Sequence, residues 1–325
     1  MNRTRTISPS TLSIWAAMLA VYVAWGSTYL AIRFSIQTIP PFLMAGIRFL
    51  IAGGVLYAYR RLKGDPAPTG RQWRSSGIVG LLLLLGGNGC VVWAEQRVVS
   101  GVAALMVASS PLWMILIDAV LRHGKPGARR PGWISILGVV LGFVGIAALV
   151  SPSELTGLHG QVDPLGAAVL TLAAFLWASG SIYSRGANLP SSPLLGTSME
   201  MLCGGAALLA VGTVSGEWAN FHPAAFSTQS LLGIGYLITI GSLIGYSAYT
   251  WLLRVAPTTL VSTYAYVNPI VAIFVGNLLA SEPLTLRVVL ATLVIVGAVV
   301  LITFTQPLSA KNAPVEAQPA AAGDD

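Results

Sequence analysis

Charged residues are scarce in this sequence. Only 9% of the residues are charged, whereas 55% are hydrophobic and the mean hydropathy is +0.76. A soluble domain carries about 25% charged residues, so this chain has too few of them to cover a water-facing surface. Long polar stretches between the apolar runs are also missing from the sequence. This excludes a sizeable soluble domain of the kind that a receptor usually carries.

Cysteine and histidine are scarce as well. Cys90 and Cys203 both lie inside apolar segments, so they offer neither a disulfide framework nor the spacing of metal ligands. The histidines, His123, His159 and His222, lie in polar segments, and no H-E-x-x-H sequence occurs. Carboxylates within the apolar runs are too sparse for a catalytic pair. We therefore expect no enzyme activity, no catalytic residue, no metal and no cofactor.

Long apolar runs, in contrast, are abundant. A helix of about 20 apolar residues crosses the roughly 30 Å hydrocarbon core of a membrane. Runs of about that length recur along the whole chain, bounded by charged residues, Pro or Gly. The sequence predicts an all-α integral membrane protein with ten transmembrane helices. Their approximate limits are 14–34, 41–59, 76–94, 98–120, 132–150, 164–184, 193–214, 231–253, 258–280 and 286–303.

The basic residues lie mostly on one side of the predicted membrane. The net charge of +7 could indicate nucleic-acid binding, but the basic residues form no continuous stripe, so we expect no nucleic-acid partner. Loops rich in Lys and Arg face the cytoplasm, which places both termini on the cytoplasmic side of the cell (inner) membrane. The inside cations are then Arg3, Arg5, Arg60, Arg61, Lys63, Arg71, Arg74, Arg122, Lys125, Arg129, Arg130, Arg185, Arg254 and Lys311, against Arg33, Arg97 and Arg287 outside.

The two halves of the sequence repeat each other. A shift of 152 residues aligns the first span with the sixth, and a shift of 158 residues aligns the third and fourth spans with the eighth and ninth. Matches in order along several spans indicate a duplicated five-helix unit. Because five is odd, the second copy must enter the membrane from the opposite side, as in many secondary transporters. The matched pairs include Trp25 and Trp177, Ser27 and Ser179, Arg33 and Arg185, Arg48 and Glu200, Gly87 and Gly245, and Pro111 and Pro269.

The repeat divides the chain into four parts. Residues 14–150 form the first five-helix repeat and residues 164–303 form the second. Residues 1–13 are expected to be a cytoplasmic N-terminus. Residues 304–325 are polar and rich in Ala and Pro, so we expect a disordered cytoplasmic tail.

Two charged residues lie well inside predicted spans. Arg48 and Glu200 are each about 10 Å along their helices, and exposing either one to lipid costs at least ~2.5 kcal/mol. Each is therefore expected to face a polar cavity or a partner. Arg48 is expected to attract an anionic group of a substrate, and Glu200 a cationic group or a proton. The alternative is a structural pair or an interfacial anchor.

Other charged residues near span ends have simpler interpretations. Arg33 and Arg185 can reach the headgroup layer, so we expect them to act as anchors. Glu95 and Asp118 are expected to be solvated.

Aromatic and polar residues at mid-depth are further candidates for a cavity wall. Trp25 and Trp177 lie near the middle of their spans, although membrane tryptophans prefer the interface, so they pack in the bundle or line a cavity. Tyr264, Tyr266 and Asn268 cannot all face one direction, because alternate helix positions diverge by about 200°. The candidate substrate-binding residues are Trp25, Ser27, Tyr29, Arg48, Asn88, Ser110, Trp177, Glu200, Tyr246, Tyr266 and Asn268, with Tyr249 and Tyr264 as further cavity candidates.

Several segments resemble a known family. They are WGSTYLAIR, PPFLMAGIRF, NGCVVWAEQ and STYAYVNPIVAIFVGNLLASEPLT, and they resemble the EamA family of the drug/metabolite transporter superfamily, especially its YedA-like members. The resemblance covers nearly the whole chain, from about Ile14 to Thr303. It implies a ten-helix bundle of two EamA repeats and an inner-membrane carrier, often an exporter of amino acids or other metabolites. It also implies a structural role for Glu282 at the end of the ninth span.

These observations favour an alternating-access transporter over the alternatives. We expect it to move a small organic metabolite, amino acid or amphipathic drug across the membrane, outward. The alternative is a membrane-embedded receptor or sensor, or an enzyme without a recognisable catalytic motif. The expected partners are the small-molecule substrate and the lipid bilayer, with the protein a monomer or a homodimer.

Overall fold

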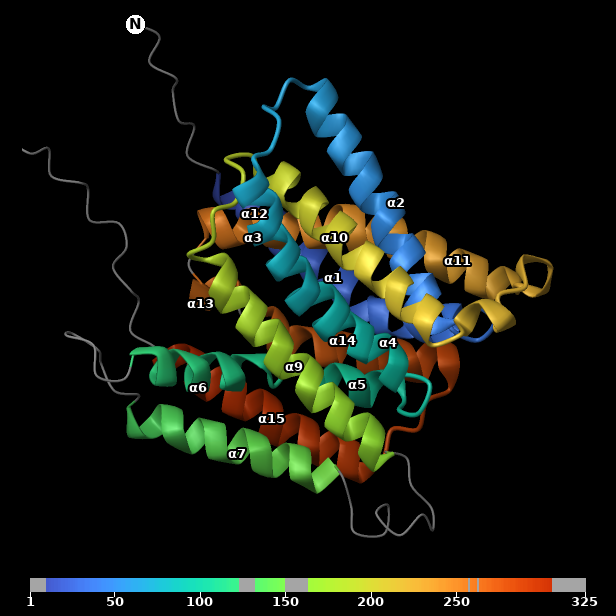
Figure 1. Cartoon of the computed structure of the whole chain (residues 1–325). Coiled ribbons are helices and arrows are strands. Elements are labelled where there is room, and N and C mark those ends of the chain that lie inside the picture. The colour runs from blue at the N-terminus through green and yellow to red at the C-terminus, as the bar shows by residue number, and fades with distance from the viewer. Residues whose placement is uncertain (1–9, 123–131, 150–162, 257, 262, 306–325) are drawn as a thin grey trace, which may run out of the picture.

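The computed structural model of the chain describes residues 10–122, 132–149, 163–256, 258–261 and 263–305. Every element of regular structure in these ranges is a helix (Figure 1). The predicted cytoplasmic tail lies almost entirely outside the described residues, as does most of the predicted N-terminal segment. The same holds for the loop cations Arg3, Arg5, Lys125, Arg129, Arg130 and Lys311.

The described residues of the first half form five helical stretches. The third is one continuous helix whose middle part, η1, is π-helical, and the fourth is interrupted next to Pro111. Proline lacks an amide hydrogen and disrupts the preceding turn of a helix, which accounts for the interruption. The elements are α1 (Thr11–Ser35), α2 (Pro41–Leu62), α3 (Gly70–Gly80), η1 (Leu81–Gly89), α4 (Cys90–Ala94), α5 (Ser100–Val107), α6 (Ser110–Arg122) and α7 (Trp133–Leu149).

The second half follows the same plan. A π-helical stretch, η4, again lies within its third long helix, at the place that corresponds to η1 in the first half. Two short 3₁₀ turns precede that helix. The elements are α9 (Pro164–Ser184), α10 (Pro193–Val214), η2 (Glu217–Asn220), η3 (Pro223–Ala225), α11 (Thr228–Tyr236), η4 (Leu237–Tyr246), α12 (Ser247–Val255), α13 (Thr258–Val261), α14 (Tyr264–Ala280) and α15 (Leu286–Thr305).

Local sequence signals account for where several helices begin. Asp163 caps α9 by accepting a hydrogen bond from the Gly166 amide at 3.1 Å. Thr69 and Gln72 form a capping box at the start of α3, which satisfies amides that have no partner within the helix. Prolines occupy the first turn of α2, α9 and α10, where a missing amide hydrogen costs nothing.

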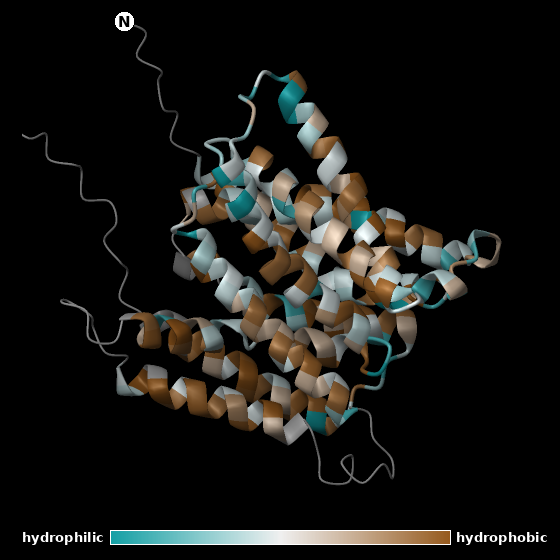
Figure 2. Ribbon diagram, in the orientation of Figure 1, coloured by the Kyte–Doolittle hydropathy of each residue, from teal (hydrophilic) through white to brown (hydrophobic). Residues whose placement is uncertain are grey.

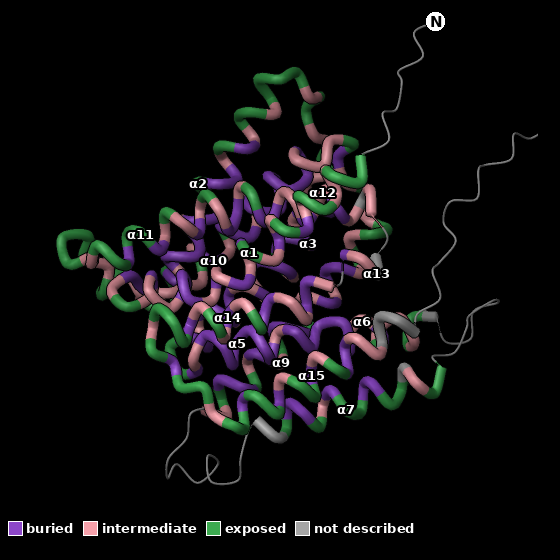
Figure 3. Tube along the Cα trace, turned by 180° about the vertical axis from the view of Figure 1, so that it is seen from behind, coloured by how far each residue is buried: buried purple, intermediate pink, exposed green. Residues whose placement is uncertain are grey.

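Seven helices are long and apolar enough to cross a membrane, and three shorter apolar helices accompany them among the described residues. Hydrophobic residues run along the helices and hydrophilic ones gather near several turns (Figure 2). Large apolar side chains remain exposed on the outside of the bundle, as on α7, α14 and α15, while the centre is buried (Figure 3). A water-facing monomer rarely exposes so much apolar surface, so lipid is the expected surroundings of these faces.

Helices of the two halves pack reciprocally. Helix α1 of the first half packs against η4 and α14 of the second, and α9 of the second half packs against η1, α5 and α6 of the first. Two further pairs of corresponding helices are α2 with α10 and α7 with α15, and α7 and α15 lie side by side in Figure 1. The predicted sequence repeat is therefore visible as a repeat of packing.

Helices α2 and α10 cross closely and run antiparallel. A Cβ atom on Gly46 would lie 2.9 Å from the Leu209 amide, whereas one on Gly53 would lie 3.0 Å from the Ser198 carbonyl. Positions further along α2 thus meet positions earlier in α10. Glycine on both helices lets their backbones approach, as is common between membrane helices.

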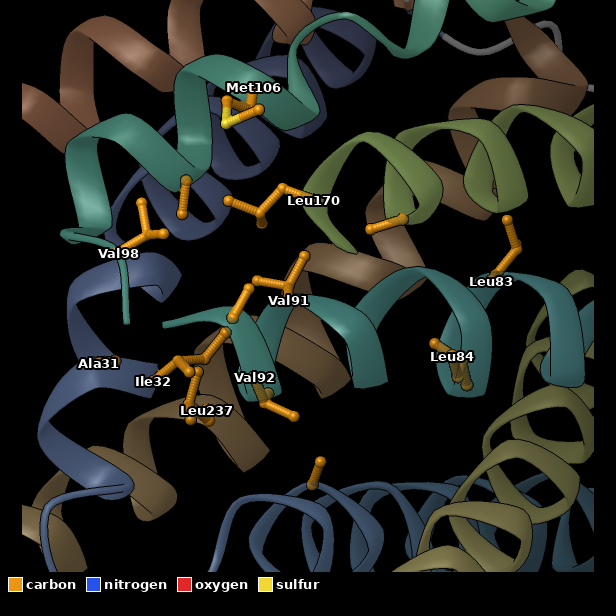
Figure 4. Close-up of a cluster of buried hydrophobic side chains, with 14 of the residues drawn as sticks. Ala31, Ile32, Leu83, Leu84, Val91, Val92, Val98, Met106, Leu170 and Leu237 are labelled. Carbon is orange, nitrogen blue, oxygen red and sulfur yellow. The ribbon is translucent and has the colours of Figure 1, made fainter. Parts of the chain in front are cut away.

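The largest buried apolar cluster fills the space between the two halves. Figure 4 shows Ile32, Val91, Met106, Leu170 and Leu237 among its side chains, and they come from α1, α4, α5, α9 and η4. This packing fixes the positions of the helices that surround the site described below.

The glycines of α2 offer a matched test of this packing. We expect Gly53→Ala to destabilise the protein by about 1–3 kcal/mol, because its methyl group would lie 2.8 Å from the Met201 Cβ and close to the α10 backbone. The control is Gly54→Ala, because a Cβ at Gly54 meets nothing within 4 Å. Thermal unfolding of the purified variants in detergent should show a lower midpoint for Gly53→Ala alone. Equal midpoints would contradict the close α2–α10 contact.

Candidate functional site

A pocket lies between the two halves of the bundle. It holds about 670 Å³ of empty space, part of which is open to solvent, and the centre of a water molecule can move within about 70 Å³ of it. Its walls come from α1, α2, η1, α4, α5, α9, η4 and α14. The wall residues are Trp25, Thr28, Tyr29, Ile32, Arg48, Phe49, Leu84, Gly87, Asn88, Val91, Val107, Ala173, Trp177, Gly241, Tyr246, Tyr264 and Asn268.

Helical spacing explains which residues reach the pocket. On α1 they recur at the intervals of one helix face, and the η1–α4 helix repeats the same intervals from Leu84 to Val91. On α14, Tyr264 and Asn268 are four positions apart and share a face. On η4, Gly241 and Tyr246 are five positions apart, which suits the longer repeat of a π-helix.

Aromatic rings form one side of the pocket. The rings of Trp25 and Trp177 meet edge to face with centroids 5.5 Å apart, and Trp25 meets Tyr264 in the same way at 5.4 Å. Tyr249 lies behind them, 4.7 Å from Trp25 between centroids. Such pairs contribute about 0.5–1.5 kcal/mol beyond their burial. The two tryptophans that the repeat aligns in sequence therefore also meet in space.

Two glycines make room for these tryptophans in a symmetric way. A Cβ atom on Gly87 would lie 2.9 Å from the Trp177 ring, and one on Gly245 would lie 2.9 Å from the Trp25 ring. Gly87 and Gly245 also correspond to each other in the sequence repeat. Each tryptophan thus rests on a glycine of the π-helical stretch of the opposite half.

Arg48 supplies the positive charge of the pocket. Its side chain is buried, and its Nε donates a hydrogen bond to Ser242 Oγ at 2.8 Å. Its Nη1 is buried and has no hydrogen-bond partner among the described residues. The same is true of Asn88 Oδ1, Asn268 Oδ1 and Trp177 Nε1. An unsatisfied buried polar group costs about 1–3 kcal/mol, so these groups mark where a polar ligand or water would be stabilised.

Glu200 is buried too, but it does not line the pocket. It accepts a hydrogen bond from the hydroxyl of Tyr246, a wall residue, at 2.8 Å. No ion pair joins Arg48 and Glu200 among the described residues. Their partners, Ser242 and Tyr246, both belong to η4, and this helix therefore connects the two buried charges.

Three other sequence candidates are held away from the pocket. Ser27 hydrogen-bonds to its own helix and to the hydroxyl of Tyr236 at 2.7 Å. Ser110 donates to the Val107 carbonyl at 2.6 Å, which satisfies the backbone before Pro111. Tyr266 points away from the face that Tyr264 and Asn268 present, and it packs in a second apolar cluster. Of the predicted substrate-binding residues, the pocket thus unites Trp25, Tyr29, Arg48, Asn88, Trp177, Tyr246 and Asn268.

One expectation about charges near helix ends was wrong. Glu95 was expected to be solvated, but it is only 5% exposed. It lies where α4 ends, and helices packed around this end shield it from solvent. Arg33, expected as a headgroup anchor, forms an ion pair with Glu282 while its side chain stays 34% exposed.

Glu282 organises that end of the bundle. Its carboxylate accepts hydrogen bonds from the Ser100 hydroxyl at 2.6 Å and from the amides of Ser100 and Gly101 at 3.1 Å each. An anion at the start of a helix satisfies its free amides and favours the helix dipole. Glu282 therefore caps α5 from a distant part of the chain, besides pairing with Arg33.

Sequence reasoning missed most of the apolar wall and Thr28. The signal that could have found Thr28 and Ile32 is their helical spacing, because both follow Trp25 at positions of the same helix face. No local signal marked Phe49, Val107 or Ala173, because apolar residues that face lipid and those that face a pocket look alike in sequence.

Known proteins share this architecture and sequence. The model of the EamA-like transporter family matches residues 12–151 and again residues 164–304. The chain is 38% identical over 293 residues to a protein of Escherichia coli named as the uncharacterized inner membrane transporter YedA, covering 90% of this chain and 91% of that one. It is 25% identical over 295 residues to a chloroplastic WAT1-related protein of Arabidopsis thaliana, covering 90% and 70%.

A solved crystal structure shares the fold, with a TM-score of 0.60 at 19% identity over 91% of this chain and 98% of the other. The family model matches twice and spans most of the sequence. The chain therefore belongs to the EamA-like transporter family and is a membrane transporter built from two EamA repeats.

Neighbouring alanines on α9 offer a test of the pocket. Ala173 lines it, whereas Ala174 is buried in packing, and both side chains are nearly inaccessible to solvent outside. In a background with Cys90 and Cys203 replaced by Ala, we expect a small polar thiol reagent to modify Ala173→Cys at least about ten-fold faster than Ala174→Cys. Mass spectrometry of the labelled protein measures both rates. Equal rates would mean that no solute reaches this wall.

Proposed function

We propose that this chain is a secondary transporter that moves a small organic solute across the cell (inner) membrane by alternating access, with export as its direction. The observation that carries the proposal is the pocket, because both repeats build it. Arg48 and Asn88 come from the first repeat, and Trp177, Tyr246 and Asn268 from the second. A site at the interface of two repeats is the usual place for the substrate of such carriers.

The proposed topology has ten membrane crossings, with the second repeat inverted relative to the first and both termini in the cytoplasm. The antiparallel crossing of α2 and α10 supports the inversion, because these helices correspond in the repeat. The Lys and Arg bias of the predicted loops supports the orientation. Two similar halves with opposite orientation can exchange conformations, which opens the pocket to one side and then to the other.

The dimensions of the pocket limit the solute. The centre of a water molecule can move within about 70 Å³ of the pocket. A buried water needs about 10–15 Å³ of this space, so the pocket holds roughly five to seven waters or one solute of comparable volume. Its wall offers flat aromatic faces together with a guanidinium group and two amides. The proposed solute therefore combines an apolar or aromatic body with polar groups at one end. The protein would act as a monomer or a homodimer.

A receptor, sensor or enzyme is the alternative. The comparisons favour the carrier, because the family is one of transporters and the relatives with functional names are named as transporters.

A flux measurement decides between the carrier and these alternatives. Purified protein in liposomes should carry at least one member of a panel of amino acids, carboxylates and amphipathic amines, and counterflow should accelerate that flux. No solute-dependent flux for any member would refute the carrier.

The hydrogen bond between Glu200 and Tyr246 should matter for transport. We expect Glu200→Gln to lower flux at least about ten-fold while insertion and the unfolding midpoint stay near wild type, because the amide keeps the shape but loses the charge. Tyr246→Phe removes the hydrogen bond but keeps the charge of Glu200, and it serves as the matched variant. Unchanged flux and unchanged pH dependence in Glu200→Gln would remove this residue from the mechanism.

The proposed inversion can be tested without a substrate. Residues 60–74 and 215–230 should lie on opposite sides of the membrane, because they follow corresponding helices of the two repeats. Single cysteines at Lys63 and Thr228, in the cysteine-free background, should react with an impermeant thiol reagent from opposite sides of intact cells. Labelling of both from one side would contradict the inverted arrangement.

A further inference from the structure

The pocket wall contains a buried cation and no acidic residue. Arg48 lines the pocket, and no carboxylate in the described part of the chain forms an ion pair with it. Glu200 reaches the wall through the hydroxyl of Tyr246, and Glu95 is buried outside the wall. A buried charge is costly unless an opposite charge or hydrogen bonds compensate it. A ligand that brings a negative charge to Arg48 would therefore be stabilised here.

The guanidinium of Arg48 is held in one orientation. Its Nε donates to Ser242 Oγ at 2.8 Å, and a Cβ atom on Gly241 would lie 3.1 Å from its Nη2. The Phe49 ring centroid lies 4.5 Å from its Cζ. Nε and Nη2 form one edge of the planar guanidinium, and this edge faces η4. That leaves Nη1, which is buried and has no hydrogen-bond partner among the described residues, as the nitrogen that can serve a ligand.

The other unpaired polar groups of the wall are neutral. Trp177 Nε1 is a donor without a partner, and Asn88 Oδ1 and Asn268 Oδ1 are acceptors without one, in the part of the chain that the structure describes. An ammonium group could donate to these amides. Neutral amides do not replace the counter-ion that a buried ammonium needs, and the positive charge of Arg48 would repel it. The polar groups of the pocket thus favour a carboxylate over an amine.

We propose that the substrate of this pocket is an aromatic monocarboxylate without an amino group, and that its carboxylate accepts a hydrogen bond from Nη1 of Arg48. The proposal rests on the proposed transport function and names its substrate class. Trp25, Trp177 and Tyr264 form an aromatic wall against which a flat ring can pack. The volume of the pocket suits a single ring with a short side chain.

Probes that share a benzyl group test this class. Phenylacetate carries a carboxylate on that group, phenylacetamide a neutral amide, benzylamine a cation, and phenylalanine both charges. Calorimetry with the purified protein in detergent at neutral pH measures their binding. We expect phenylacetate to bind at least about ten-fold more tightly than phenylacetamide, because a hydrogen bond between charged groups is about twice as strong as a neutral one. Benzylamine and phenylalanine should bind more weakly than phenylacetate, because their ammonium group finds no acidic residue in the wall.

Substitution of Arg48 tests its role in this preference. We expect Arg48→Met to bind phenylacetate no more tightly than phenylacetamide, because the side chain keeps its bulk but loses the charge and Nη1. Its unfolding midpoint and its affinity for phenylacetamide report whether the pocket is intact. The control is Lys63→Met, which removes one positive charge from the exposed C-cap of the same helix. This variant should keep the preference of the unmodified protein.

Each part of the proposal has a result that would overturn it. If phenylacetate does not bind, or binds no better than phenylacetamide or benzylamine, the carboxylate class is wrong. Phenylalanine that binds as tightly as phenylacetate would overturn the exclusion of an amino group. A preference that persists in Arg48→Met would overturn the role of Arg48. If that variant does not fold, Arg48→Lys replaces it, because an ammonium lacks the planar donors of a guanidinium, and an undiminished preference there would overturn the contact through Nη1.

The outcomes also separate this inference from the proposed function. If phenylacetate shows no preference in binding but liposomes carry neutral or cationic members of the panel, the transporter proposal stands and the substrate class is wrong. If phenylacetate binds with the expected preference but no member of the panel crosses the membrane, the binding class stands and the transporter is refuted.

Discussion

The rest of the structure depends on one constraint, which is that charges inside an apolar bundle must be stabilised by the protein itself. The chain has few charged residues, yet Arg48, Glu95, Glu200 and Glu282 are all buried. Glu282 is held by Arg33 and by the amides at the start of α5, and Glu200 is held by Tyr246. Arg48 and Glu95 are stabilised less completely by fixed neighbours, since Nη1 of one and both oxygens of the other lack hydrogen bonds among the described residues. For Arg48 the incomplete stabilisation coincides with the pocket, where a ligand or water can supply what the protein does not.

Duplication explains how so much of this arrangement arises from a simple plan. Trp25 and Trp177 correspond in sequence and meet at the centre of the bundle. Trp25 rests on Gly245 and Trp177 rests on Gly87, and these two glycines also correspond in the sequence repeat. Arg48 and Glu200 also correspond, but they carry opposite charges and have different partners. The repeat therefore supplies matching positions, and divergence at those positions gives the two sides of the pocket different chemistry.

The sequence was sufficient for the helical class, the repeat and the central position of Trp25, Trp177 and Asn268, because each of these rests on periodicity or on a match between halves. It was also sufficient to show that Tyr264, Tyr266 and Asn268 cannot share a face, and the structure separates Tyr266 from the other two. It was not sufficient for Glu95. This residue lies at a helix end, where distance along the chain suggests exposure, and only tertiary packing decides whether a neighbouring segment covers it. The apolar wall was beyond reach for a related reason, since Val107 or Ala173 would look the same against lipid.

Helix η4 is the element that connects the separate parts of the site. It provides Ser242 to Arg48, Tyr246 to Glu200, Gly241 to the pocket wall and Gly245 to the Trp25 ring. It is π-helical, and its hydrogen-bond pattern differs by one residue from that of the α-helices on either side. A local return to α-helical geometry would rotate these residues relative to one another. Because η4 holds Ser242 and Tyr246, such a change would alter the surroundings of Arg48 and Glu200 together. It would also move Gly245, on which the Trp25 ring rests.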